Sequence, residues 1–233
     1  MFVNTHNILK RFIEQSRRDK THELQLTPHK RCAMWGVILL FLVTTGSAQT
    51  LKKATPEQSK KMVETINKAT ASVKSIQCDF TQVRQSTMLK EKQTSKGKMS
   101  FSGKNLKWEY TEPNPFALTV KEENGQQQVY IQQDGKTKKA DAQSAQLFKG
   151  IAQIVMGSVT GTALSNNGDF TLEMYTQGNI WIAKLTPKQP KLKKMFTSIH
   201  LYFNEKHNAV TKVEMKEANG DGTVITFANV KLS

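Results

Sequence analysis

Alternation of apolar and polar residues in short runs is the feature that most constrains the fold of this chain. In residues 95–113, SKGKMSFSGKNLKWEYTEP, lysines alternate with large apolar side chains. A strand with this period of two places its apolar side chains on one face and its lysines on the other. The same period predicts strands from 75 towards 89, and at 95–102, 106–111, 116–121, 127–133, 169–176, 179–185, 197–204, 210–217 and 222–230.

Short, turn-like links join most of these runs, for example at 102–105, 177–179 and 219–222. Links this short imply antiparallel neighbours. A sheet of about ten antiparallel strands must curl, split or close. A barrel that wide is not filled by side chains alone, so the pattern predicts a half-barrel with an apolar concavity.

Two segments have helical spacing instead. Thr55 is a candidate N-cap, Pro56 suits the first helical position, and Gln58 completes a Thr-x-x-Gln capping box. Residues 141–158 also carry apolar side chains at helical spacing. These helices could plug or lid the half-barrel. Residues 188–196 are predicted to form a basic loop or a single helical turn.

The apolar residues that face the concavity are the candidate ligand-binding residues. For any one of them the alternative is ordinary core packing, because apolar residues are usually buried for packing alone. The strands contribute Met99, Phe101, Leu106, Trp108, Tyr110, Phe116 and Leu118, and the second helix contributes Phe148, Ile151 and Ile154.

Residues 1–48 have the pattern of an export leader. A basic stretch at 29–31 precedes an apolar run at 34–43, and Gly46, Ser47 and Ala48 fit a cleavage site. The apolar run is too short to span a bilayer, although a membrane anchor is the alternative. Residues 1–28 are either a long basic region or the product of a wrongly assigned start. Residues 49–233 show no linker or repeat and are predicted to form one domain.

The charge and the cysteines limit the possible partners. The formal net charge is +15, yet Arg84 is the one arginine after residue 48, against 26 lysines. Arginine supplies the fork that reads phosphates and guanine edges, so nucleic-acid binding is not expected. Cys78 is the one cysteine after residue 48, which allows no internal disulfide. Cys32 lacks the surroundings of a lipid-modified cysteine, so the exported chain is expected to be soluble.

No motif in residues 49–233 indicates catalysis or metal binding. His200 and His207 have no cysteine or carboxylate at metal-ligand spacing, and both are expected to be exposed. Asp79 and Glu109 lie on polar strand faces where solvated carboxylates are ordinary. We therefore expect no enzyme, no metal and no cofactor.

Several segments, in order, resemble the periplasmic outer-membrane lipoprotein carriers of the LolA family. They are Asp79-Phe80-Thr81-Gln82, a strand that starts at Gly97, the Asn105 to Tyr110 run with Pro113, a helix in the middle of the chain, and a C-terminal strand with an Asn-Gly turn. The resemblance implies an open (unclosed) antiparallel β-barrel of about ten to eleven strands with an α-helical lid. It also implies a monomer whose cavity takes lipoprotein acyl chains, with an inner-membrane releasing transporter and an outer-membrane acceptor as partners.

One position departs from the family pattern. The family carries an arginine before the tryptophan strand that holds the lid closed, and the corresponding position here is Ser102 or Gly103. Lys104 or Lys107 is the candidate replacement for this lid contact.

Two other functions remain open. An interaction module with a similar open barrel is found in periplasmic regulators of anti-sigma factors, as the N-terminal part of a longer chain. Because this chain ends in its last strand, the carrier is the favoured expectation. A carrier of another amphiphilic lipid would give the same sequence pattern.

Overall fold

The computed structural model of the protein describes residues 50–87, 92–141, 164 and 168–233. The described strands form one antiparallel sheet of twelve, in the order β1-β8-β9-β10-β11-β12-β2-β3-β4-β5-β6-β7. They are β1 (Lys52–Lys53), β2 (Ser75–Gln85), β3 (Lys92–Ser102), β4 (Asn105–Glu112), β5 (Phe116–Glu123), β6 (Gln126–Gln133), β7 (Lys136–Lys139), β8 (Phe170–Gln177), β9 (Ile180–Pro187), β10 (Phe196–Phe203), β11 (Val210–Glu217) and β12 (Gly222–Leu232). The described helices are α2 (Pro56–Thr70) and α5 (Pro190–Lys193).

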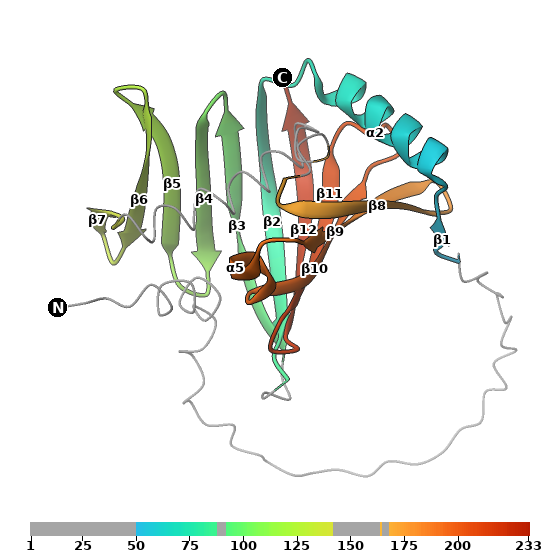
Figure 1. Cartoon of the computed structure of the whole chain (residues 1–233). Coiled ribbons are helices and arrows are strands. Elements are labelled where there is room, and N and C mark those ends of the chain that lie inside the picture. Colours follow the sequence, from blue (N-terminus) through green and yellow to red (C-terminus); the bar gives the residue numbers. More distant parts are fainter. Residues whose placement is uncertain (1–49, 88–91, 142–163, 165–167) are drawn as a thin grey trace, which may run out of the picture.

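The two end strands of the sheet, β1 and β7, do not pair with each other, so the sheet is unclosed. Figure 1 shows β2 to β6 roughly upright and β8 lying almost across them, which means that the sheet curls strongly. The strand order also places the C-terminal strand β12 beside β2, the strand that follows α2, and the two pair along most of their length. The predicted open antiparallel barrel is confirmed.

The helix α2 begins where the sequence predicted. The hydroxyl of Thr55 accepts a hydrogen bond from the backbone N–H of Gln58 at 3.2 Å, and the Gln58 side chain accepts one from the N–H of Thr55 at 2.9 Å. This reciprocal pair is the capping box. Met62 and Ile66 are buried in the same core cluster as the strand residues, so α2 covers part of one face of the sheet.

Tight turns set the register of the hairpins that follow. Asn124 and Gly125 have φ of 53° and 74°, and Asp134 and Gly135 have φ of 51° and 71°. Two successive residues with positive φ form the hairpin turn whose twist matches that of the flanking strands. The β5–β6 and β6–β7 hairpins are therefore specified locally by Asn-Gly and Asp-Gly.

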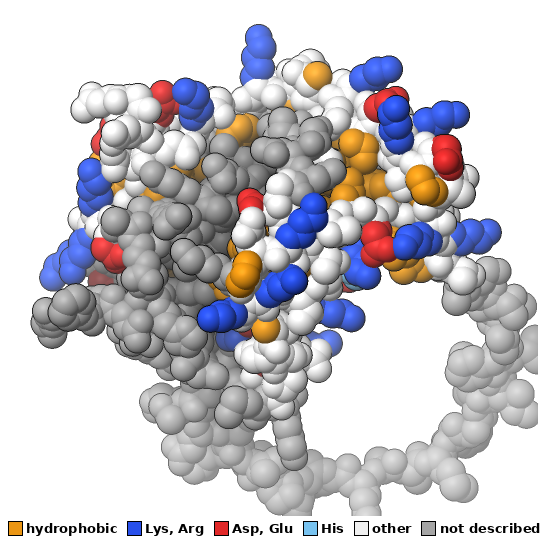
Figure 2. All heavy atoms as spheres, in the orientation of Figure 1, with side chains coloured by type: hydrophobic (Ala, Val, Ile, Leu, Met, Phe, Trp, Pro, Cys, Tyr) orange, Lys and Arg blue, Asp and Glu red, His pale blue; other side chains and the backbone are white. Residues whose placement is uncertain are grey.

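The sheet has two chemically different faces. The inner face carries the core side chains, and its members lie directly opposite one another across neighbouring strands, as Met99, Trp108 and Leu118 do. The outer face carries charged pairs such as Lys98 opposite Glu109 and His200 opposite Glu214. In Figure 2, which has the orientation of Figure 1, lysine and acidic side chains lie around the edge of the molecule.

The structure agrees with the predicted strands and adds to them. All ten predicted strands are present, as β2–β6 and β8–β12, and α5 is the predicted helical turn. Two short strands, β1 and β7, were not predicted because every residue in them is exposed and neither shows an apolar alternation. The predicted leader at 1–48 and most of the predicted helix at 141–158 lie outside the described residues.

Within the described part of the chain, no helix combines the length and the apolar character needed to cross a bilayer.

Candidate functional site

The seven strand residues chosen from the alternation come together on the inner face. All are buried, with exposed fractions of 2% to 7%, and all belong to one hydrophobic cluster. They are contributed by three consecutive strands: Met99 and Phe101 by β3, Leu106, Trp108 and Tyr110 by β4, and Phe116 and Leu118 by β5. That they contact a ligand stays a prediction. The three helix candidates, Phe148, Ile151 and Ile154, lie outside the described residues.

An aromatic cluster forms the centre of the inner face. The Phe80 ring lies 4.5 Å from the Trp108 ring and 5.1 Å from the Tyr110 ring, measured between centroids, and the second pair is nearly perpendicular at 88°. Phe227 of β12 meets Trp108 edge to face at 6.0 Å, and Phe116 lies 6.2 Å from Tyr110. These separations suit aromatic contacts, so four strands share one continuous apolar surface.

A buried hydrogen bond crosses this surface. The hydroxyl of Tyr110 donates to the side-chain oxygen of Gln82 at 2.9 Å, and both side chains are buried. Burial raises the pKa of Tyr110, so the phenol stays protonated and remains a donor. This hydrogen bond pairs the hydroxyl of Tyr110 with the side-chain oxygen of Gln82, so neither of these two buried atoms lacks a partner.

A buried ionic group closes one end of the inner face. A terminal nitrogen of the Arg84 guanidinium lies 2.7 Å from a carboxylate oxygen of Asp221 and 3.3 Å from one of Glu217, and all three side chains are buried. Burial alone would raise the pKa of Asp221. Hydrogen bonds from the backbone and hydroxyl of Thr87, together with the charge of Arg84, outweigh it and hold that pKa below its usual value.

These buried polar residues were not predicted, because an alternating pattern places polar residues on the outer face of a sheet. A signal was available, because Gln82 and Arg84 continue the even-numbered series of Ile76, Cys78 and Phe80, which face inward. The free thiol of Cys78 belongs to the same series. Burial raises its pKa to about 12, so the thiol stays protonated.

The two lysines proposed as lid contacts have partners on the sheet. Lys104 pairs with Glu122 at 2.8 Å, and Lys107 pairs with Glu109 at 2.9 Å. Lys107 lies on the outer face, since it alternates with the inward-facing Leu106 and Trp108. Contact of either lysine with a lid stays a prediction, because the segment proposed for the lid is not among the described residues.

The prediction that both histidines are exposed is wrong. The side chain of His200 is 22% exposed, because it lies in a row with Lys184 and Glu214. His207 is half-buried because its ring stacks on Trp181, with centroids 3.6 Å apart and planes 8° apart. Burial lowers the pKa of both imidazoles. Among the described residues, no group of three or more His, Cys, Asp and Glu side chains is placed to hold a metal ion.

The family of the chain is shown by a sequence match that covers all strands of the sheet except β1. The model of the family described as "Outer membrane lipoprotein carrier protein LolA" matches residues 71–233, which include every strand from β2 to β12. The chain belongs to the LolA family. The family is described as one of lipoprotein carriers. Because the chain belongs to it, the open sheet with a buried apolar inner face is the LolA fold in this chain. No curated protein sequence matches it.

Three solved structures match this chain at low sequence identity and with low TM-scores. A LolA superfamily protein of Nitrosomonas europaea is 12% identical with a TM-score of 0.39, over 75% of this chain and 93% of that one. The lipoprotein LppX of Mycobacterium tuberculosis is 6% identical with a TM-score of 0.39, over 76% and 96% of the two chains. LprF of Mycobacterium bovis is 13% identical with a TM-score of 0.39, over 76% and 94%.

Proposed function

We propose that this protein is an exported periplasmic carrier that binds lipoprotein acyl chains against its inner face and ferries them from the inner to the outer membrane. Membership of the LolA family supports the carrier role. The observation that carries the proposal is the continuous apolar inner face across β2 to β5 and β12, on a sheet that does not close. The leader predicted at residues 1–48 supports export.

The energetics of acyl chains explain why such a surface is needed. Burying one methylene contributes about 0.8 kcal/mol, so a lipoprotein with several chains does not leave a bilayer unaided. A carrier must offer an apolar surface of similar extent that holds few competing polar groups. On this inner face, Gln82 and Tyr110 satisfy each other, and Arg84 is paired with two carboxylates.

Transfer between the two membranes needs two partners. A releasing transporter in the inner membrane would load the carrier, and an acceptor in the outer membrane would unload it. The protein acts as a monomer that binds and transfers its cargo and catalyses no covalent step.

Trp108 allows a direct test, because its ring lies at the centre of the inner face. The protein with Trp35→Phe and Trp181→Phe keeps Trp108 as its one tryptophan. Titration with a phospholipid whose acyl chains are brominated should quench Trp108 fluorescence and saturate, since bromine quenches an indole that it contacts. Quenching that is absent, or that rises linearly with the probe, contradicts acyl binding at the inner face.

The cargo is identified by a second measurement. Lipids and peptides extracted from the protein purified from the cell envelope are analysed by mass spectrometry. A triacylated lipoprotein supports the proposed cargo, whereas a free fatty acid or another amphiphile shows that the carrier serves a different lipid.

A further inference from the structure

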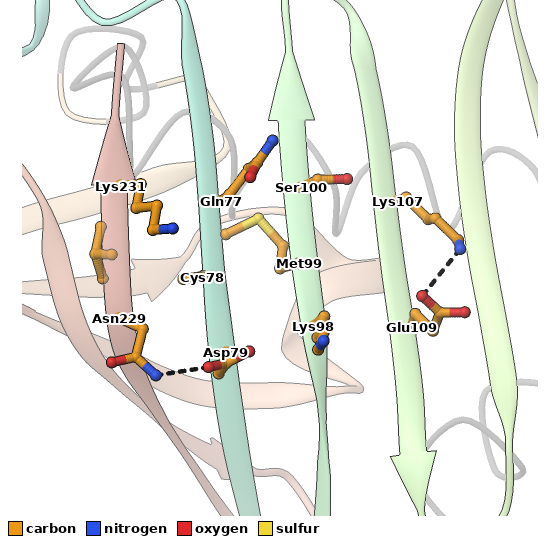
Figure 3. A pocket seen from close by; sticks show the side chains of 11 residues that line it. Gln77, Cys78, Asp79, Lys98, Met99, Ser100, Lys107, Glu109, Asn229 and Lys231 are labelled. Carbon is orange, nitrogen blue, oxygen red and sulfur yellow. Dashed lines mark hydrogen bonds and ion pairs between the residues drawn. The ribbon is translucent and has the colours of Figure 1, made fainter.

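A trough lined by polar and apolar residues crosses the outer face of β12, β2, β3 and β4. It has a volume of about 810 Å³. Figure 3 shows these strands in the reverse order from Figure 1, so it views the sheet from the side opposite to the inner face. The polar side chains of its lining therefore point away from the surface proposed to bind acyl chains, whereas Cys78 and Met99, which also line it, belong to the inner face.

The strand register places the lining side chains in two rows. In the first row, Lys231 lies opposite Gln77, Gln77 opposite Ser100, and Ser100 opposite Lys107. In the second row, Asp79 lies opposite Lys98, and Lys98 opposite Glu109. A bulge in β12 between Ala228 and Lys231 brings Asn229 to the end of this second row (Figure 3).

Hydrogen-bond donors are in excess in this trough. The carboxylate of Asp79 accepts a hydrogen bond from the Asn229 amide at 2.7 Å, and that of Glu109 pairs with Lys107 at 2.9 Å. Both acidic groups thus have partners already. Lys98 and Lys231 are exposed, and no carboxylate of the described residues lies within ion-pair distance of either ammonium group. A ligand that fits must supply negative charge.

The length of the trough indicates the kind of anion. Neighbouring strands lie about 4.8 Å apart, so the distance from β12 to β4 is about 14 Å. A single phosphate cannot span this distance. An extended peptide rises about 3.3 Å per residue and covers it with four to five residues. The carboxylates of a peptide are discrete and can meet Lys98 and Lys231 while leaving Asp79 and Glu109 unopposed, whereas the evenly charged surface of an anionic bilayer would also face these two carboxylates. This difference favours a peptide over a membrane.

We propose that this trough binds an extended acidic segment of a partner protein. Its carboxylates pair with Lys98 and Lys231, and its remaining polar groups meet the amide of Gln77 and the hydroxyl of Ser100. The trough lies on the opposite side of the sheet from the acyl-binding face, so the proposal does not depend on lipid carriage.

Fluorescence anisotropy with a labelled peptide of alternating Glu and Ser tests the proposal on the purified full chain. The double variant Lys98→Gln/Lys231→Gln should weaken peptide binding about fivefold, as expected for the loss of two exposed ion pairs. The matched control Lys60→Gln/Lys68→Gln removes the same charge from exposed positions of α2 and should leave binding unchanged. A peptide of alternating Gln and Ser should not bind.

Each other outcome overturns the proposal. Absence of saturable binding would show that the trough holds no peptide site. Equal weakening in both double variants would show that the peptide follows net charge alone. Displacement of the peptide by inorganic phosphate at matched ionic strength would show a site for small anions. Vesicles with anionic headgroups that bind the unchanged protein but not the Lys98/Lys231 variant, without peptide binding, would show a membrane-docking surface.

Discussion

The phenyl ring of Phe80 lies against Gly97, which is its direct partner across β2 and β3. A Cβ atom on Gly97 would lie 2.5 Å from Cζ of Phe80 and 2.0 Å from the backbone oxygen of Glu109. Since Phe80 also contacts Trp108 and Tyr110, the absence of a side chain at Gly97 leaves the space that the Phe80 ring of this aromatic cluster occupies.

The variant Gly97→Ala should therefore destabilise the protein. The added methyl group must displace the Phe80 ring and part of β4, and overpacking of this kind costs about 1–3 kcal/mol or more. Urea unfolding measures the loss. Gly222→Ala is the matched control, because the nearest atom to its Cβ would be 3.9 Å away and its φ is not positive. Equal losses of unfolding free energy in the two variants would contradict the close contact between Gly97 and Phe80.

The Tyr110–Gln82 hydrogen bond gives a second prediction. Tyr110→Phe leaves the buried amide of Gln82 without this donor, and a loss of about 1–3 kcal/mol in unfolding free energy is expected. The double variant Tyr110→Phe/Gln82→Leu replaces both partners by apolar groups and should recover part of that loss. The four proteins form a double-mutant cycle. Additive losses would show that the two side chains do not interact.

The buried ionic group predicts a dependence of stability on pH. Because the pKa of Asp221 is lower in the folded protein than in the unfolded chain, its contribution is present above about pH 4 and is lost as the pH falls through the folded-state pKa. Asp221→Asn should thus be less stable than the unchanged protein at pH 7, and the difference should narrow in acid. Urea midpoints from pH 7 to pH 3 measure it. If the difference in stability between Asp221→Asn and the unchanged protein stays constant over this pH range, the charge of Asp221 does not stabilise the fold.

Much of the fold could be predicted, because the alternation of apolar and polar residues that marks each strand lies within that strand. Strand positions follow from alternation, and the start of α2 follows from Thr55, Pro56 and Gln58. The short strands β1 and β7 could not be predicted, since they pair with the edges of β8 and β6 and carry no apolar pattern of their own.

The candidate sites could be predicted only where each residue lies on a strand with its own alternation. The seven apolar candidates share a face because each lies on a strand with a clear alternation. Burial of Arg84 depends on Asp221, which lies 137 positions along the chain and reaches Arg84 only through the pairing of β2 with β12. The outer trough depends on the register of four strands and on the bulge at Asn229, and neither is encoded within one strand.

Export gives a prediction that rests on the leader alone. The envelope form of the protein should begin at Gln49, because cleavage is expected after Ala48. N-terminal sequencing of that form tests it. A form that still contains Trp35 would show that the apolar run is kept as an anchor.

Leu106 provides the test that separates a ligand-binding face from an ordinary core. Its place beside the Gly103 turn predicts that Leu106 lies at a solvent-exposed rim of the inner face, and this prediction is wrong. The structure buries it to 3% exposure, because it lies between Phe101 of β3 and Val120 of β5. A charged substitution would therefore unfold the protein, and Leu106→Thr is the milder probe.

Leu106→Thr places a hydroxyl on the inner face, where an acyl chain would have to desolvate it. A cost of about 1–2 kcal/mol is expected, which lowers affinity for a fluorescent fatty-acyl probe about tenfold. Ile182→Thr is the matched control, because Ile182 is buried to a similar degree but packs on the outer face beside Tyr202. Thermal melting should show comparable losses of stability for both variants. If the two also bind the probe equally well, the inner face is a packed core and does not hold the lipid.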